Sequence, residues 1–87
     1  MRKIEWTHAF KRDFKKHDTF EGAFIEVLWK LANDEILPER FQDHALSGQW
    51  HDHRDCHIKP DLVLIYRKPD DVELQLVRLG SHSELGL

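Results

Sequence analysis

Apolar residues recur at helical spacing in the first third of the chain. Phe10 and Phe14 lie four residues apart, which places both side chains on one face of a helix. Thr7 is a residue type that caps helix N-termini, and the cations at positions 15–17 suit the negative end of a helix dipole. The pattern therefore predicts an amphipathic helix over His8–His17.

A second helix is predicted directly after the first. Its buried face consists of five apolar residues: Phe20, Phe24, Val27, Leu28 and Leu31. Asp18 followed by Glu21 fits a capping box at its start. Asn33 and Asp34 weaken the helical pattern, and Pro38 marks the end because the residue before a proline disfavours helix. The short joint between the two segments predicts a helical hairpin.

The remaining apolar patterns indicate short strands. Arg2–Trp6 fits an edge strand before the first helix. Three further strands are predicted in the last third of the chain, at Arg54–Ile58, Leu62–Arg67 and Val72–Gly80. The continuous apolar run of Leu62–Arg67 is typical of a central strand. We interpret Leu37–His53 as a long polar loop that turns at Gly48 and is anchored by Trp50.

The order of these elements, β-α-α-β-β-β, predicts the fold class. It indicates an α+β fold in which two N-terminal helices pack on one face of a small, largely antiparallel sheet. The length of 87 residues is enough for a single domain, and no internal repeat or linker divides residues 1–87.

Strand alternation assigns side chains to the two faces of this sheet. Cys56 and Ile58 share one face, which we expect to be the core, so Asp55 and His57 share the other. We call this second face the open face, because the helices are expected on the opposite side.

The last strand breaks its own alternation. Leu74 and Leu76 define one face, but Val77 and Leu79 then continue the polar face. A β-bulge near Leu76–Val77 would return Val77 and Leu79 to the core and turn Arg78 to the open face. We predict that bulge.

Composition narrows the function classes. The net charge of −3 argues against indiscriminate nucleic-acid binding, which needs an excess of Lys and Arg. No apolar run approaches the roughly 20 residues of a membrane span, and the N-terminus lacks the apolar segment of a signal peptide. The single cysteine closes no internal disulfide, so we expect a cytoplasmic protein.

Candidate chemistry gathers where the predicted strands end. The residues are His44, Asp55, His57, Asp61, Arg78 and His82. If they converge, two histidines can act as base and acid in metal-independent RNA cleavage, and an arginine can bind the phosphate. A carboxylate such as that of Asp61 can orient an imidazole. Taken singly, each histidine fits a surface residue, Asp61 fits turn chemistry and Trp50 fits a packing anchor.

A metal site is the competing interpretation. His51, His53, Cys56 and His57 lie within seven residues and are donors that zinc accepts. Their spacing matches no usual zinc motif, however, and alternation would point Cys56 away from His57. We expect no metal and no other cofactor.

Several spaced segments together resemble one protein family. They are FQDHALSGQW over 41–50, RDCHIKPDLVLIY over 54–66 and RLGSHSEL over 78–85. This combination is similar to the YafQ branch of the RelE/ParE toxin–antitoxin superfamily, and the helical half agrees in order and length.

The resemblance implies a RelE-like fold and a toxin that cuts messenger RNA in the ribosomal A site. It implies a cognate antitoxin as partner and operator DNA bound only by the toxin–antitoxin complex. Matching the motifs residue by residue implies five catalytic positions: His44, His57, Asp61, Arg78 and His82. We expect proton transfer by His82 and His44. We further expect substrate contacts from Asp55, Arg54, Lys59, Leu85 and Leu87.

The chain departs from the family pattern at one point. The family usually has an aromatic residue directly after the stretch matching Ser83-Glu84-Leu85, and Gly86-Leu87 stands there instead. A base stacked on such a ring is worth about 1–3 kcal/mol. The alternative hypothesis is therefore a weak or inactive toxin-fold module that acts through antitoxin binding and operon repression.

Overall fold

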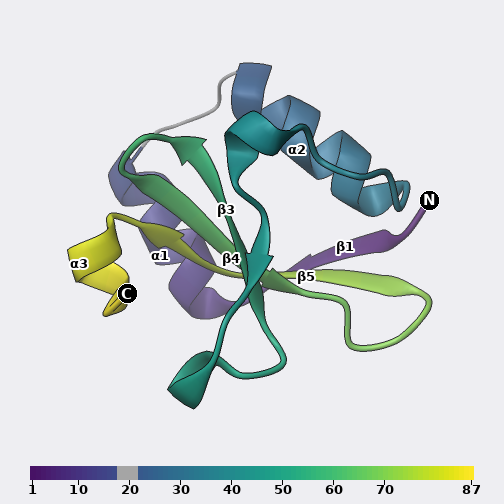
Figure 1. Ribbon diagram of the computed structural model, residues 1–87. Coiled ribbons are helices and arrows are strands. Elements are labelled where there is room, and N and C mark those ends of the chain that lie inside the picture. The colour runs from purple at the N-terminus through teal and green to yellow at the C-terminus, as the bar shows by residue number, and fades with distance from the viewer. Residues whose placement is uncertain (18–21) are drawn as a thin grey trace.

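A five-stranded sheet forms the centre of the protein, with helices on both faces (Figure 1). The computed structural model describes residues 1–17 and 22–87. The strands are β1 (Lys3–Trp6), β2 (His44–Ala45), β3 (Arg54–Lys59), β4 (Leu62–Arg67) and β5 (Glu73–Gly80). The helices are α1 (His8–His17), α2 (Gly22–Ala32) and α3 (His82–Leu85), with short 3₁₀ helices η1 (Glu39–Phe41) and η2 (Gly48–Trp50). No helix among the described residues has both the length and the apolar character needed to cross a bilayer.

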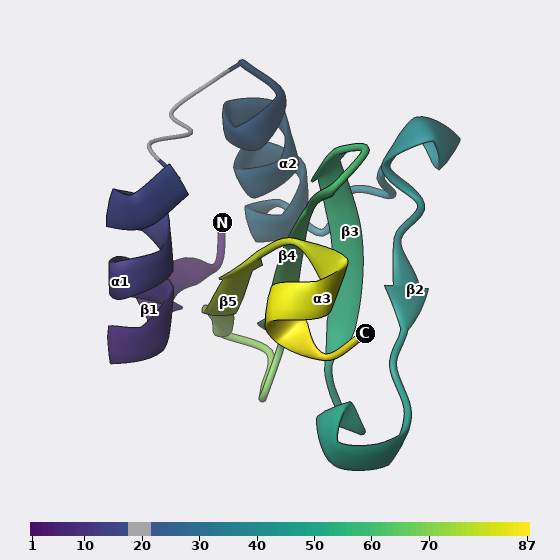
Figure 2. The same ribbon diagram turned by 90° about the vertical axis from the view of Figure 1, so that its left-hand side faces the viewer.

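The strand order across the sheet is β1-β5-β4-β3-β2. β1 pairs parallel with β5, and the other three pairings are antiparallel. The side view shows β2 and β1 at opposite margins of the sheet (Figure 2). The predicted largely antiparallel sheet and the edge position of the first strand are therefore confirmed.

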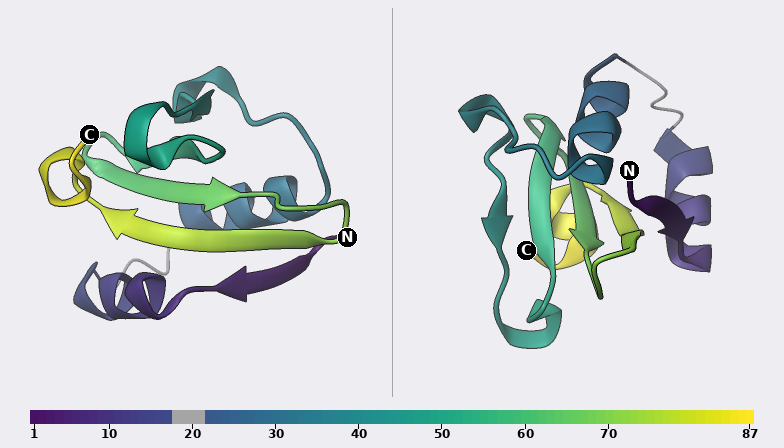
Figure 3. Two further views of the ribbon diagram at one scale, coloured as in Figure 1. Left: turned by 90° about the horizontal axis from the view of Figure 1, so that it is seen from below. Right: turned by 90° about the vertical axis from the view of Figure 1, so that its right-hand side faces the viewer.

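The two long helices cover one face of the sheet. Thr7 caps α1 as predicted, because its Oγ1 accepts the backbone N–H of Phe10 at 3.0 Å. The ring of Phe24 on α2 lies 5.5 Å from that of Phe14 on α1, measured between centroids. Both helices share one apolar core with the sheet. Figure 3 shows the helices beside the sheet from two further directions. The predicted capping box at Asp18 and the buried Phe20 lie outside the described residues.

β4 is buried on both faces, as its continuous apolar run predicted. Leu64 faces the helices and Ile65 the opposite side, and neither side chain is exposed. Cys56 on β3 is also fully buried on the helix side, which confirms the alternation inferred for that strand.

Four short elements escaped the sequence prediction. The segment predicted as an irregular loop contains β2 and both 3₁₀ helices, and a two-residue strand leaves no periodic pattern to detect. The chain also ends in α3 rather than in the last strand. Here a signal existed, because Ser81 and Glu84 form a reciprocal capping box at the start of that helix.

The predicted bulge in the last strand is present. Ile65 pairs with Arg78, and Tyr66 pairs with Leu76, which leaves Val77 as the extra residue. Leu79 thereby returns to the helix-side core, where it is fully buried. The expectation for Val77 was wrong: its side chain packs into a second, smaller cluster on the open face.

Candidate active site

A small apolar cluster on the open face supports the site. Val63, Ile65 and Leu85 are buried there, with Trp50 packed against them. The indole Nε1 of Trp50 donates to the Leu85 carbonyl at 3.3 Å, which ties the loop of η2 to α3. Trp50 is thus the predicted packing anchor. Leu85, predicted as a substrate contact, is only 3% exposed and instead fixes α3 to the sheet.

His82 stands at the first turn of α3 and is held by Asp61 from the β3–β4 turn. The Oδ1 atom of Asp61 lies 2.8 Å from His82 Nδ1 and accepts the His82 backbone N–H at 3.2 Å. These hydrogen bonds lower the pKa of Asp61, so the carboxylate is charged at neutral pH. A charged carboxylate only accepts hydrogen bonds, so Nδ1 of His82 carries the proton and Nε2 is left available.

His57 on β3 lies directly beside His82. The two imidazole rings meet edge to face, with centroids 4.9 Å apart and planes at 76°. His57 pairs across the sheet with Val63. Two residues that are 25 positions apart in sequence therefore form one imidazole pair on the open face.

His44 on β2 enters the site from the other margin of the sheet. Its Nδ1 lies 2.8 Å from the carbonyl oxygen of Gln42 and 3.1 Å from Oδ1 of Asp55. A carbonyl only accepts hydrogen bonds, so this geometry also assigns the proton to Nδ1. His44 and His82 consequently share one tautomer, and among the described residues neither Nε2 has a hydrogen-bond partner.

The segment around His44 is fixed from the opposite face of the sheet. Asp43 accepts a hydrogen bond from the Tyr66 hydroxyl at 2.6 Å and one from Arg54 Nε at 3.2 Å. Burial and the carboxylate of Asp43 both raise the pKa of Tyr66, so its hydroxyl stays protonated and donates. Arg54 thus holds the backbone of the site and lies on the helix side, away from the imidazoles.

Asp55 is the buried polar residue beneath the imidazoles. It is 2% exposed, and its Oδ1 finds no hydrogen-bond donor in suitable geometry among the described residues. Burial raises the pKa of Asp55 because the charged form loses solvation, and the nearby histidines His44, His57 and His82 act in the opposite direction. The 3.1 Å approach to His44 is therefore an electrostatic contact rather than a well-aligned hydrogen bond.

These side chains border a shallow hollow of about 690 Å³. Its lining consists of His44, Leu46, Ser47, Gln49, Trp50, Asp55, His82, Gly86 and Leu87. Leu87, predicted as a substrate contact, lines the same hollow as His44 and His82 and is 40% exposed. Lys59 and His57 line a neighbouring hollow of about 490 Å³. The volume of the first hollow, about 690 Å³, suits a nucleotide-sized ligand more than a small ion.

Arg78 shares the open face but is not among the residues that line the hollow. It follows Ile65 and Asp55 in one row across β5, β4 and β3. Its guanidinium is bound by Asp13 of α1, with Nε donating to Oδ2 at 2.7 Å. The structure therefore brings together His44, Asp55, His57, Asp61 and His82, and sets Arg78 two strands away from Asp55.

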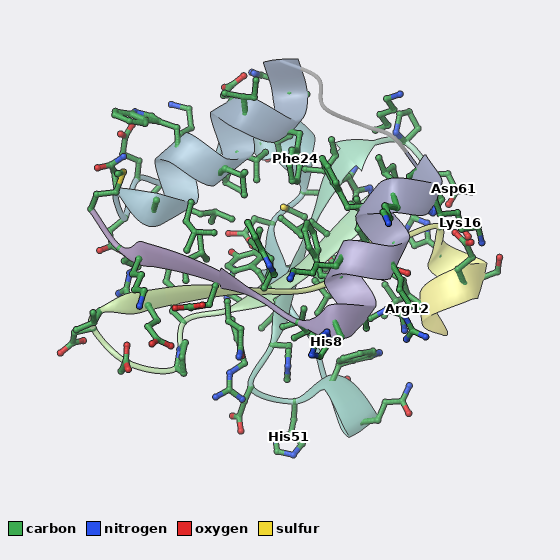
Figure 4. The ribbon with its side chains drawn as sticks, turned by 180° about the vertical axis from the view of Figure 1, so that it is seen from behind. His8, Arg12, Lys16, Phe24, His51 and Asp61 are labelled. Atoms are coloured by element: carbon green, nitrogen blue, oxygen red, sulfur yellow. The ribbon has the colours of Figure 1, made fainter. Side chains whose placement is uncertain are left out.

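Sequence reasoning missed the residues of α1 that contact the site. Besides Asp13, Lys16 forms an ion pair with Glu84 of α3, and His17 Nε2 lies 3.1 Å from the same carboxylate. Figure 4 shows Lys16 at the end of α1 that lies next to α3. Helical spacing places positions 13, 16 and 17 on one face of α1, but it does not reveal which segment that face contacts.

The alternative metal site does not assemble. Cys56 is buried on the helix side, whereas His57 lies on the open face. His51 lies at the far end of the molecule from Asp61 (Figure 4). Within residues 1–17 and 22–87, no three His, Cys, Asp or Glu side chains are placed to hold one metal ion.

Comparison with known proteins places this arrangement in a family. The sequence model of a family described as "Bacterial toxin of type II toxin-antitoxin system, YafQ" matches residues 2–86. The mRNA interferase toxin YafQ of Escherichia coli K12 is 32% identical over 89 residues, covering 98% of this chain and 96% of the relative.

Two solved structures extend the likeness to the backbone. A copper-bound mutant toxin from Helicobacter pylori superposes with a TM-score of 0.90 at 48% identity, over 98% of this chain and 99% of that one. The toxin in the E. coli DinJ–YafQ toxin–antitoxin complex gives a TM-score of 0.81 at 32% identity, over 97% and 96% of the two chains.

Proposed function

Because the chain belongs to the YafQ family of bacterial toxins of type II toxin–antitoxin systems, we propose that it is an endoribonuclease that cuts messenger RNA in the ribosomal A site. The observation that carries the proposal is the meeting of three imidazoles and two carboxylates from three distant segments. The name of the E. coli relative, an mRNA interferase, supports the same activity.

His44 and His82 carry the proton transfers in this proposal. Cleavage needs a base that takes the proton of the 2′-hydroxyl and an acid that protonates the departing 5′-oxygen. Both histidines line the hollow, and in each the Nδ1 is held by an oxygen acceptor, which leaves the Nε2 for proton transfer. The 2′-oxygen attacks the phosphorus and the bond to the 5′-oxygen breaks, which leaves a 2′,3′-cyclic phosphate and a 5′-hydroxyl.

The remaining residues support these two steps. Asp61 orients the ring of His82 through the contact at Nδ1. His57, edge-on to His82, positions that ring or shares its proton. Arg78 binds the phosphate and stays charged throughout. All groups are side chains of the protein, so the proposed reaction needs no metal.

Induced expression followed by mapping of transcript ends tests this function. We expect growth arrest and cuts at in-frame codon positions, both lost in His44→Ala and in His82→Ala. Expression without toxicity, while the antitoxin still binds, would support the alternative of a binding module.

We also propose that the partner is a cognate antitoxin, as in the E. coli complex. A groove of about 720 Å³ runs between α1, α2 and β1. Its apolar residues are Ile4, Trp6, Phe10, Phe14, Phe24, Leu28 and Leu76, and its margin consists of His8 and three cations, Lys11, Arg12 and Lys15. An apolar floor with a basic margin fits an acidic amphipathic segment.

Two exposed tryptophans allow a matched test of this groove. Trp6 lines it and is 55% exposed, whereas Trp29 on α2 is 59% exposed but lies outside it. We expect Trp6→Ala to weaken antitoxin binding at least tenfold in calorimetry, and Trp29→Ala to leave it unchanged. The reverse result would place the antitoxin elsewhere.

A further inference from the structure

The cation proposed to bind the phosphate is held by a carboxylate from a distant helix. Asp13 of α1 accepts Arg78 Nε on Oδ2 at 2.7 Å and Arg78 Nη2 on Oδ1 at 3.3 Å. The contact is therefore side-on and uses two of the guanidinium donors. The side chains of Asp13 and Arg78 are 15% and 31% exposed, which screens the pair partly from solvent.

Asp13 is itself anchored on the edge of β5. Oδ2 also accepts the backbone N–H of Leu79 at 3.0 Å. β1 pairs with β5 only as far as Leu76, so this end of β5 lacks a strand neighbour on that side. Thr7 and Asp13 bond to the edge instead, since the Thr7 hydroxyl donates to the Val77 carbonyl at 2.7 Å.

The bulge at Val77 and the hydrogen bonds from Arg78 to Asp13, which we call the clamp, act on the same residue, Arg78. The extra Val77 turns Arg78 to the open face, and Asp13 then fixes the direction of the guanidinium. An arginine has five N–H donors, so two side-on bonds leave three for another ligand. Because Asp13 already holds the guanidinium in one orientation, Arg78 has less rotational freedom to lose when it binds a phosphate.

We propose that Asp13 is a positioning residue for Arg78, which presents the free donors of the guanidinium to the scissile phosphate. This proposal rests on the proposed ribonuclease function. If Asp13 instead restrained Arg78 by neutralising its charge, the carboxylate would slow the reaction, and its removal would speed cleavage. A purely structural role at the edge of β5 would affect stability but not depend on Arg78.

A double-mutant cycle separates these roles. Single-turnover cleavage on programmed ribosomes is measured for wild type, Asp13→Ala, Arg78→Ala and the double variant. We expect Asp13→Ala to slow cleavage about tenfold, with little further loss in the Arg78→Ala background. Asp71→Ala, an exposed aspartate in the β4–β5 turn, is the matched control and should cleave normally. Faster cleavage by Asp13→Ala, or equal losses in both backgrounds, would overturn the proposal.

A second measurement does not depend on cleavage. In a ¹⁵N relaxation experiment, we expect the Arg78 Nε–H signal to be rigid in wild type and mobile in Asp13→Ala. Asp13→Asn keeps one acceptor oxygen and the shape of the side chain, so an intermediate signal is expected and guards against misfolding of the alanine variant. A signal unchanged in both variants would overturn the clamp. If wild type fails to cut RNA while the clamp is observed, the proposed function fails and the positioning of Arg78 stands.

Discussion

The two faces of the sheet are built on different principles. On the helix face, apolar side chains from α1, α2 and three strands form one continuous core that includes Val27, Leu64 and Leu79. On the open face, only a small cluster around Val63, Ile65 and Leu85 is apolar. Around it stand imidazoles and carboxylates, one of them buried with an unsatisfied oxygen.

The contrast separates stability from chemistry. Burial of apolar area gives the helix face its contribution to folding, at roughly 25 cal/mol per Å². A buried carboxylate such as Asp55 works against folding, because its charged form loses solvation. We propose that Asp55 is retained for its electrostatic effect on its neighbours, His44 and the His57–His82 pair, because perturbed carboxylates cluster at functional sites.

The largest expected effect is on activity alone. His82→Ala removes one proposed acid–base group and should slow mRNA cleavage by roughly 10²–10⁴-fold. Because His82 is partly exposed, the free energy of unfolding in urea should change by less than about 0.5 kcal/mol. His51→Ala is the control, since its side chain is 75% exposed at the far end of the molecule. Equal activity of both variants would contradict the proposed role.

The converse variant lies on the helix face. Leu64 is fully buried, so Leu64→Ala should lower the free energy of unfolding by about 2–5 kcal/mol. Cleavage per folded molecule should stay close to wild type. Ile36→Ala, at a side chain that is 93% exposed, should cost almost nothing. A loss of activity in Leu64→Ala beyond its loss of folded protein would show that the two faces are coupled.

Asp55→Asn tests the buried carboxylate. A folded-state pKa above the unfolded value means that the native protein binds more protons, so wild-type stability falls as pH rises through this range. The asparagine variant lacks this loss. Its advantage should be absent near pH 3 and reach about 1–3 kcal/mol above the folded pKa, measured by urea unfolding at several pH values. A variant less stable than wild type at pH 8 would show that the charge is compensated.

The smallest effect concerns the end of the chain. Leu87 lines the hollow, so Leu87→Phe should add stacking on a base and strengthen RNA binding by about 1 kcal/mol. Gly86→Phe is the informative companion: Gly86 has a φ of 70° as the cap of α3, which strains any L side chain. We expect a lower melting temperature for Gly86→Phe and an unchanged melting temperature for Leu87→Phe. If Gly86→Phe alone strengthened RNA binding, position 86 rather than position 87 would be where an aromatic ring stacks on a base.

The elements that sequence predicted are those with periodic patterns. α1 begins and ends at the predicted residues, and the two-residue alternation of β3 separated Cys56 from Asp55. Even the bulge was visible, because Val77 and Leu79 broke the alternation of the last strand. The six candidate residues are also on the open face or at its ends, which strand alternation and the family resemblance both indicated.

What sequence could not give are contacts between distant segments. Nothing local reveals that Asp13 meets Arg78, since the two are 65 positions apart and joined only by the tertiary fold. Arg54 was misplaced for the same reason, because its partner Asp43 lies on β2's flank, on the helix side. Leu85 was predicted as a substrate contact because α3 and the apolar cluster beneath it were not foreseen.

The turn between β3 and β4 has a consequence for how this chain tolerates change. Only Pro60 and Asp61 connect the paired residues Lys59 and Leu62, and that aspartate fixes the ring at the start of α3. Surface loops generally accept insertions at small entropic cost. Here a single added residue would swing the carboxylate out of reach of its imidazole. The longer β4–β5 connection does not hold an imidazole of the site. Length variation among homologous chains should therefore concentrate there and spare the β3–β4 turn.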